Sequence, residues 1–289
     1  MTQAVLSVLG LLTLGFSYVF FKDTVKNKHT FSDASWAKLS LVGFIVNFFD
    51  TLGIGSFAPT TAFFKLMKLV PDKLIPGTLN VSMTIPVVLE ALIFITVIQV
   101  EPITLISMLA SATLGAVVGA GIVSKLPEKK IQIGMGIALL VVAMIFLAGM
   151  FNLMPVGGEA IGLTGTKLII GVVGNFILGA LMTIGIGLYA PCMALVYALG
   201  MSPRVAFPIM MGSCAFLMPA ASIKFVQEGA YDRKASVAIT IAGTIGVLIA
   251  AYIVKTLPLN LLKWLVVFVI IYTAITMLRS AFNNQVANE

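Results

Sequence analysis

The feature that most constrains this chain is a series of long apolar stretches that recur along its whole length. About 20 apolar residues in a helix cross the roughly 30 Å hydrocarbon core of a bilayer. Only 10% of the residues are charged, against about 25% in soluble domains, so lipid is the solvent that suits this chain. Seven stretches are uninterrupted: Ala4–Phe21, Leu79–Ile98, Pro102–Val123, Ile131–Phe151, Val205–Val226, Ala235–Val254 and Leu261–Leu278. The sequence therefore predicts an all-α polytopic membrane protein.

Two further apolar stretches, Leu39–Val70 and Leu168–Leu199, are interrupted by glycines followed by a proline. The interruption TLGIGSFAP at 51–59 is matched by TIGIGLYAP at 183–191, with six of nine positions identical at an offset of 132. Such self-similarity fixes the architecture, because it marks a repeated structural unit. The predicted division is an N-terminal helix with a basic loop (1–37), a first repeat (38–152), a linker (153–166), a second repeat (167–280) and a C-terminal tail (281–289).

The distribution of basic residues favours a topology for the two broken stretches. If each crossed the membrane once, the 18 Lys and Arg would divide 9 against 9 between the two sides. If each is a helical hairpin that enters and leaves on one side, they divide 14 against 4. Basic residues collect in cytoplasmic loops, which favours the hairpins. Each repeat then has one hairpin and three crossings, so the second repeat is inverted, with the N-terminus outside and the C-terminus cytoplasmic.

The two breaks contain the residues with the clearest chemical role. Glycines permit an unwound turn, and a proline suits the first turn of the helix that follows. The N-terminus of that helix presents free N–H groups and a partial positive charge, which favour an anion. Inverted repeats with paired broken helices are typical of secondary transporters that bind substrate near the midplane. The predicted substrate-binding residues are Thr51, Gly53, Gly55, Ser56, Pro59, Thr60, Thr61, Thr183, Gly185, Gly187, Pro191 and Cys192.

A simpler interpretation of the breaks is a pair of kinked helices that pack closely through glycine. Close packing is also what the spacing Gly115-x-x-x-Gly119 and the neighbouring Gly121 predict. Two matched breaks at one register favour the binding-site interpretation over the kinks.

Two acidic residues lie within apolar stretches, where charges are rare and are functional candidates. Asp50 directly precedes the first break and has Met182 as its counterpart, so the hairpin fold does not require it. It is the candidate group for coupling to protons or sodium, and the alternative is a carboxyl bonded to Asn47 or Thr51. For Glu90 the sequence favours a structural role.

The sequence shows no pattern typical of an enzyme, a metal site or a bound cofactor. Cys192 and Cys214 lie in apolar segments, and the single histidine, His29, lies in a basic loop. The net charge of +7 is explained by cytoplasmic loops rather than by nucleic acid. The expected partners are the lipid bilayer and a small anionic substrate, and the oligomeric state is left open.

The motif DTLGIGSFAPTTA at 50–62 and its echo at 183–194 resemble the repeated motif of the TauE/SafE family, over nearly the whole chain. That resemblance implies a bacterial inner-membrane permease for sulfite or organosulfonates. Our prediction is a secondary transporter of such an anion, bound between the two hairpins. The alternatives are a passive anion channel, a membrane-embedded enzyme or assembly factor of sulfur metabolism, and an exporter of a neutral metabolite.

Overall fold

The computed structural model describes residues 2–52, 54–94, 99–153, 157–185, 187–253 and 259–283. Within these ranges the chain is helical, and the only bridge between extended residues joins Ala160 and Met201. The α-helices are α1 (Thr2–Lys26), α2 (Trp36–Thr51), α3 (Phe57–Met67), α4 (Ile75–Phe94), α5 (Pro102–Val123), α6 (Glu128–Met150), α7 (Gly165–Met182), α8 (Tyr189–Ala198), α9 (Pro203–Gln227), α10 (Arg233–Ile253) and α11 (Leu259–Asn283). Short 3-10 helices precede α2 (η1, Lys28–Thr30) and α4 (η2, Asp72–Leu74). The all-α prediction is confirmed.

Seven helices in the described part of the chain are long and apolar enough to cross a membrane, which confirms a multi-pass membrane protein. Six of them, in α1, α4, α5, α6, α9 and α10, coincide with predicted crossings. The seventh is α7, which we expected to be one arm of a hairpin. The predicted crossing Leu261–Leu278 lies within α11, whose described side chains give the shorter apolar segment Ile270–Phe282.

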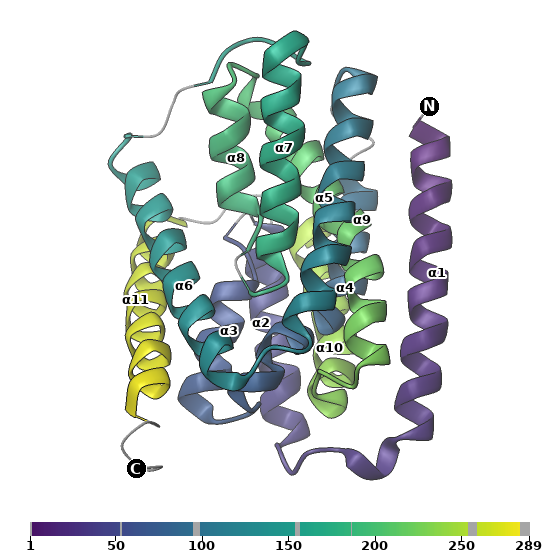
Figure 1. The fold of residues 1–289 in the computed structure, drawn as a ribbon, viewed down its shortest axis with the longest axis vertical. Helices are drawn as coiled ribbons and strands as arrows, with labels where there is room; N and C mark the ends of the chain where they lie inside the picture. Colours follow the sequence, from purple (N-terminus) through teal and green to yellow (C-terminus); the bar gives the residue numbers. More distant parts are fainter. Residues whose placement is uncertain are drawn as a thin grey trace.

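Both interrupted stretches form two separate helices rather than one kinked helix. α2 ends at Thr51 and α3 begins at Phe57, and α7 ends at Met182 while α8 begins at Tyr189. Figure 1 shows α2 and α3 in the lower half of the molecule and α7 and α8 in the upper half. α3 has 11 residues and α8 has 10, which at 1.5 Å per residue gives about 15–17 Å, roughly half the hydrocarbon thickness.

Contacts between connecting segments define the two ends of the molecule. At one end, Arg233 pairs with Asp23 of α1 (2.7 Å), and Gln132 of α6 donates to Asp72 of η2 (2.9 Å). At the other, Glu101 N–H donates to the carbonyl of Ile161 (2.9 Å). α2 and α3 connect to η1 and η2 at the first end, whereas α7 and α8 connect to 157–164 and 199–202 at the second. Each pair is therefore a hairpin, and the two hairpins enter from opposite ends.

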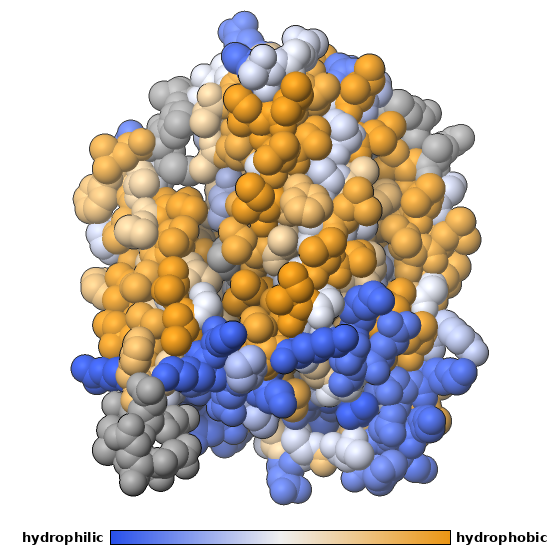
Figure 2. Space-filling model, viewed as in Figure 1, coloured by the Kyte–Doolittle hydropathy of each residue, from blue (hydrophilic) through white to orange (hydrophobic). Residues whose placement is uncertain are grey.

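Hydrophilic side chains gather at the end of the molecule where α1 finishes, and an apolar belt covers most of the remaining visible face (Figure 2). This basic end includes the ion pairs of Lys65 with Asp72 and of Lys125 with Glu228. The gathering agrees with the lysine-rich side that the hairpin topology predicts.

Helices of one predicted repeat pack mainly against helices of the other. α2 packs along α10, and its counterpart α7 packs along α5. In the same way α5 packs on α9, its counterpart α10 packs on α4, and α4 meets α9 at the centre. Exchanging α2–α6 with α7–α11 reproduces these pairs, as expected of two repeats related by a pseudo-twofold axis. Most residues of α4 and α9 are buried, whereas only 22% of the apolar window is buried in α1 and in α7. The centre of the fold is thus α4 and α9 flanked by the two hairpins.

Glycines bring α5 and α7 into backbone contact, as the sequence predicts for Gly115 and Gly119. A Cβ atom on Gly115 would lie 2.0 Å from the carbonyl oxygen of Phe176, and one on Gly119 would lie 2.6 Å from that of Ala180. The prediction is wrong for Gly121, where a Cβ atom would meet nothing within 4 Å. Gly121 lies on a face of α5 with no helix against it.

We expect Gly115→Ala to lower the thermal stability of the purified protein and Gly121→Ala to leave it unchanged. The new methyl group at Gly115 must separate two helix backbones, and overpacking of this kind costs about 1–3 kcal/mol. The fraction of monodisperse protein that survives heating in detergent measures the difference. Equal losses for the two variants would contradict the close approach of α5 and α7.

Candidate functional site

Each break contains one glycine in the left-handed region and a proline in the first turn of the helix that follows. Gly55 has a φ of 86° and Gly185 a φ of 109°, values that side chains other than hydrogen resist. Pro59 is the third residue of α3, and Pro191 is the third of α8. The expected order of helix, unwound turn and new helix start is therefore present in both hairpins.

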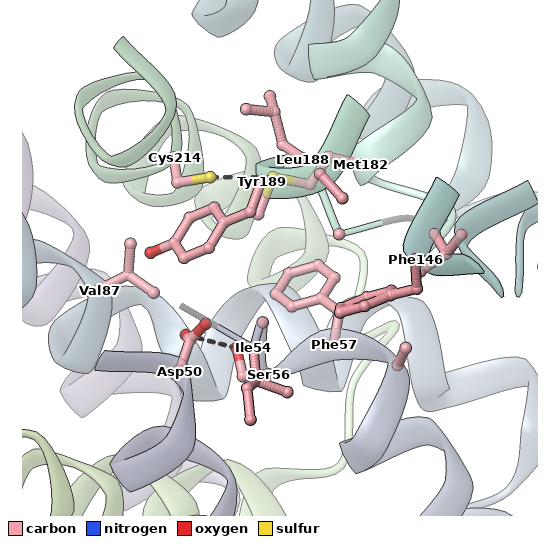
Figure 3. Close-up of a pocket in the computed structure, with 15 residues that line it drawn as sticks. Asp50, Ile54, Ser56, Phe57, Val87, Phe146, Met182, Leu188, Tyr189 and Cys214 are labelled. Atoms are coloured by element: carbon pink, nitrogen blue, oxygen red, sulfur yellow. Dashed lines mark hydrogen bonds between the residues drawn. The ribbon is translucent and has the colours of Figure 1, made fainter. Parts of the chain in front are cut away.

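The tips of the two hairpins meet at one small cavity of about 30 Å³. The starts of α3 and α8 both contribute to it, together with α4, α6 and α9. The lining residues are Asp50, Ile54, Gly55, Ser56, Phe57, Ala58, Val87, Val142, Phe146, Met182, Gly187, Leu188, Tyr189, Ala190 and Cys214. In Figure 3, Asp50 and Ser56 lie on one side of this cavity, and Tyr189, Met182 and Cys214 lie on the other.

Most of the cavity wall is apolar, and its polar groups come from few sources. The first-turn N–H groups of a helix have no partner within the helix, so the starts of α3 and α8 offer backbone donors. The side chains add the carboxyl of Asp50, the hydroxyls of Ser56 and Tyr189, and the thiol of Cys214. An apolar wall with a few convergent polar groups is typical of a small-molecule site.

Asp50 interacts with the start of the helix that follows it. Its side chain is 1% exposed, and its Oδ2 accepts a hydrogen bond from Ser56 Oγ at 2.7 Å. The backbone N–H of Ser56 also donates to this carboxyl. The first hairpin thus carries its own acidic group at the start of α3, whereas the second hairpin has Met182, the last residue of α7, at the matching position. The two halves of the cavity differ by one carboxyl group.

Glu90 contacts both hairpins through hydrogen bonds, and the sequence did not predict these contacts. It lies on α4 and is fully buried; its Oε1 lies 2.8 Å from Thr51 Oγ1 and its Oε2 accepts from the Tyr189 hydroxyl at 2.9 Å. Thr51 ends α2 of the first hairpin, and Tyr189 begins α8 of the second. Two signals were present: a glutamate within an apolar stretch, and a tyrosine where the first motif has Phe57.

The structure brings four of the predicted residues to the cavity: Asp50, Gly55, Ser56 and Gly187. Eight others lie outside its lining: Thr51, Pro59, Thr60, Thr61, Thr183, Gly185, Pro191 and Cys192. Gly53 lies outside the described residues.

Three threonine hydroxyls among the predicted residues are bonded within their own segment. Thr60 Oγ1 donates to the carbonyl of Ser56 (2.7 Å), Thr61 Oγ1 to that of Phe57 (2.9 Å) and Thr183 Oγ1 to that of Ala180 (2.6 Å). Each of these threonines is buried, and none of them lines the cavity.

The cysteines are buried free thiols. Cys214 lines the cavity and donates a weak hydrogen bond to Met182 Sδ at 3.7 Å. Among the described residues, no three His, Cys, Asp or Glu side chains are grouped so that they could hold a metal ion. The arrangement suits a solute held by helix N-termini and hydroxyls.

Comparison with known proteins identifies the family. The family model described as Sulfite exporter TauE/SafE matches residues 1–146 and 167–288. No curated protein and no solved structure gave a match. The matched residues include both hairpins and most of the helices that surround the cavity, and they leave residues 147–166 and the last residue outside. This chain belongs to the TauE/SafE family of membrane transporters.

Proposed function

We propose that the protein is a secondary transporter of a small anion, sulfite or an organosulfonate, which binds in the cavity between the two hairpin tips. The observation that carries the proposal is that the starts of α3 and α8, from hairpins that enter at opposite ends, line one cavity. Both helix N-termini favour negative charge. The description of the family supports a sulfur oxyanion as the solute.

The chemistry of the wall fits the two parts of an organosulfonate. The backbone N–H groups of the helix starts would bind the sulfonate oxygens, and the Ser56 hydroxyl would turn its proton from Asp50 to join them. The Tyr189 hydroxyl would keep its bond to Glu90. The side chains of Phe57, Phe146 and Leu188 would accommodate a short alkyl chain. Sulfite would use the same donors without the apolar contacts.

Alternating access would follow from movement of the hairpin tips around the cavity, in a protein built of inverted repeats. Asp50 remains the candidate group for coupling to protons or sodium. With the basic end in the cytoplasm of a bacterial inner membrane, the N-terminus is outside and the C-terminus inside.

Uptake of labelled sulfite, isethionate and taurine into proteoliposomes tests the proposal. We expect saturable flux of at least one anion, and we expect Ser56→Ala to reduce it about fivefold, the effect of one lost hydrogen bond. Thr60→Ala serves as the matched control, because the Thr60 hydroxyl is bonded to a backbone carbonyl one turn away.

A larger effect for Thr60→Ala than for Ser56→Ala would place the anion behind the hairpin rather than in the cavity. Absence of flux for all three solutes, with folded protein in the liposomes, would contradict the proposed substrate class.

A further inference from the structure

Glu90 makes the polar contact that links the two predicted repeats beside the cavity. Thr51 and Glu90 both belong to the first repeat, whereas Tyr189 belongs to the second. The bond from the Tyr189 hydroxyl to Glu90 Oε2 (2.9 Å) therefore joins α4 of one repeat to the start of α8 of the other, and a movement of α8 away from α4 would break it. The contact to Thr51 Oγ1 (2.8 Å) holds the same carboxyl to the end of α2.

The hydrogen-bond geometry around Glu90 accommodates a proton on its carboxyl. Thr51 Oγ1 lies 2.9 Å from the carbonyl oxygen of Asn47 as well as 2.8 Å from Glu90 Oε1. A hydroxyl has one proton to donate and can also accept. When Thr51 donates to Asn47, a protonated Glu90 donates to Thr51; when Glu90 is ionised, Thr51 turns its proton toward it. Both protonation states fit the same heavy-atom positions.

The groups that face Glu90 supply no positive charge. They are Asp50 from α2, Tyr189 from α8 and Cys214 from α9. The elements packed against α4 carry other charged residues, and these lie near the ends of those elements. They are Lys22, Asp23, Lys26, Lys38, Lys65, Asp72, Lys73, Arg204, Lys224, Arg233 and Lys234. The ion pairs found among the described residues all lie at the basic end.

Charge balance in the cavity then favours uptake of a proton with the anion. Asp50 already places a carboxyl beside the start of α3, and an ionised Glu90 would add a second negative charge next to an anionic solute. Unpaired charges in an apolar interior are strongly unfavourable. A proton on Glu90 removes one of these negative charges, so it strengthens binding of the anion. Because the two binding events are linked, the anion strengthens proton binding by the same factor.

We propose that Glu90 binds the proton that crosses the membrane together with the anion. Its hydrogen bond to Tyr189 forms in the occluded state, in which the anion and the proton are both bound. The inference rests on the proposed function, because the anion is taken to occupy the cavity. When the start of α8 moves away from α4, the Tyr189 hydroxyl leaves Glu90, water reaches the carboxyl and the proton is released on the same side as the anion.

Infrared spectroscopy of the full-length protein in lipid tests the proton site without any solute. We expect a C=O stretching band of a protonated carboxyl that is lost in Glu90→Gln and retained in Glu159→Gln, a change at an exposed residue. Tyr189→Phe should shift the band, whereas Tyr197→Phe on the same helix should not. A wild-type band that is absent, or that Glu90→Gln leaves unchanged, would overturn the inference.

Flux measurements test whether that proton is transported. In Glu90→Gln we expect anion exchange between the two sides to persist, while accumulation driven by a pH gradient falls by about tenfold or more. Equal loss of exchange and accumulation in folded protein would assign Glu90 a structural role and overturn the inference. If liposomes take up none of the three anions while the infrared band still depends on Glu90, the proton site stands and the proposed substrate is wrong.

Discussion

Gly187→Leu is expected to reduce anion flux by about a hundredfold or more while leaving the protein folded, because small misplacements of a bound solute already have effects of that size. Gly187 lines the cavity at the tip of the second hairpin. A Cβ atom there would meet only Phe57 Cβ at 3.7 Å, an ordinary contact, and the backbone is outside the left-handed region. Leucine therefore fits the backbone, and its side chain fills the space that the anion needs.

The equivalent change in the first hairpin is a poorer test. Gly55 matches Gly187 at the repeat offset, but its φ of 86° would strain any side chain, so lost flux in Gly55→Leu would mix blockage with misfolding. Gly121→Leu is the matched control, since Gly121 faces open space on α5. Flux should be compared at equal amounts of monodisperse protein in proteoliposomes. Normal flux in Gly187→Leu would exclude the cavity as the solute path.

Much of the fold could be predicted from sequence because membrane insertion imposes simple rules. Spans follow from the length of apolar stretches, and the breaks follow from glycine and proline chemistry. The lysine distribution predicted hairpins, and the contacts at the two ends agree with that topology. Length and composition alone leave α7 ambiguous, because 18 apolar residues are enough to cross and are also enough for one arm of a hairpin.

The site was less predictable, because a motif shows which residues lie near a break but not which way they point. Thr60 and Thr61 follow Pro59 directly, yet a buried threonine within a helix commonly donates to the carbonyl one turn back, as both do here. That preference was available from the sequence and argues against free hydroxyls at these positions.

Contacts between distant segments could not be obtained from one sequence. Glu90 and Tyr189 are 99 positions apart, and no repeat equivalence links them. Only the packing of α4 and α9 between the two hairpins brings the carboxyl of one repeat to the hydroxyl of the other. A glutamate in an apolar stretch was visible, but its partners required the fold.

The Asp50→Asn variant tests whether the protein is a coupled transporter or a passive channel. Asparagine keeps an oxygen that can accept from Ser56, but it removes the titratable charge beside the start of α3. A unit charge about 5 Å from an anion is worth roughly 3 kcal/mol at an effective dielectric constant of about 20, so we expect anion binding to tighten about a hundredfold. Accumulation driven by a proton or sodium gradient should fall by a similar factor, because Asp50 no longer changes its charge.

The matched control is Asp33→Asn, an exposed residue in the loop before α2, which should alter neither quantity. Binding can be measured by calorimetry with sulfite or isethionate, and accumulation in proteoliposomes with an imposed gradient. If Asp50→Asn leaves flux intact and wild-type flux ignores both gradients, the protein is a channel. If binding weakens instead, Asp50 holds the start of α3 in a conformation that receives the anion, and its charge is not the coupling element. Tighter binding would show that this carboxyl competes with the anion for the N-terminus of α3. Weaker binding would show that it holds that N-terminus in the conformation that binds the anion.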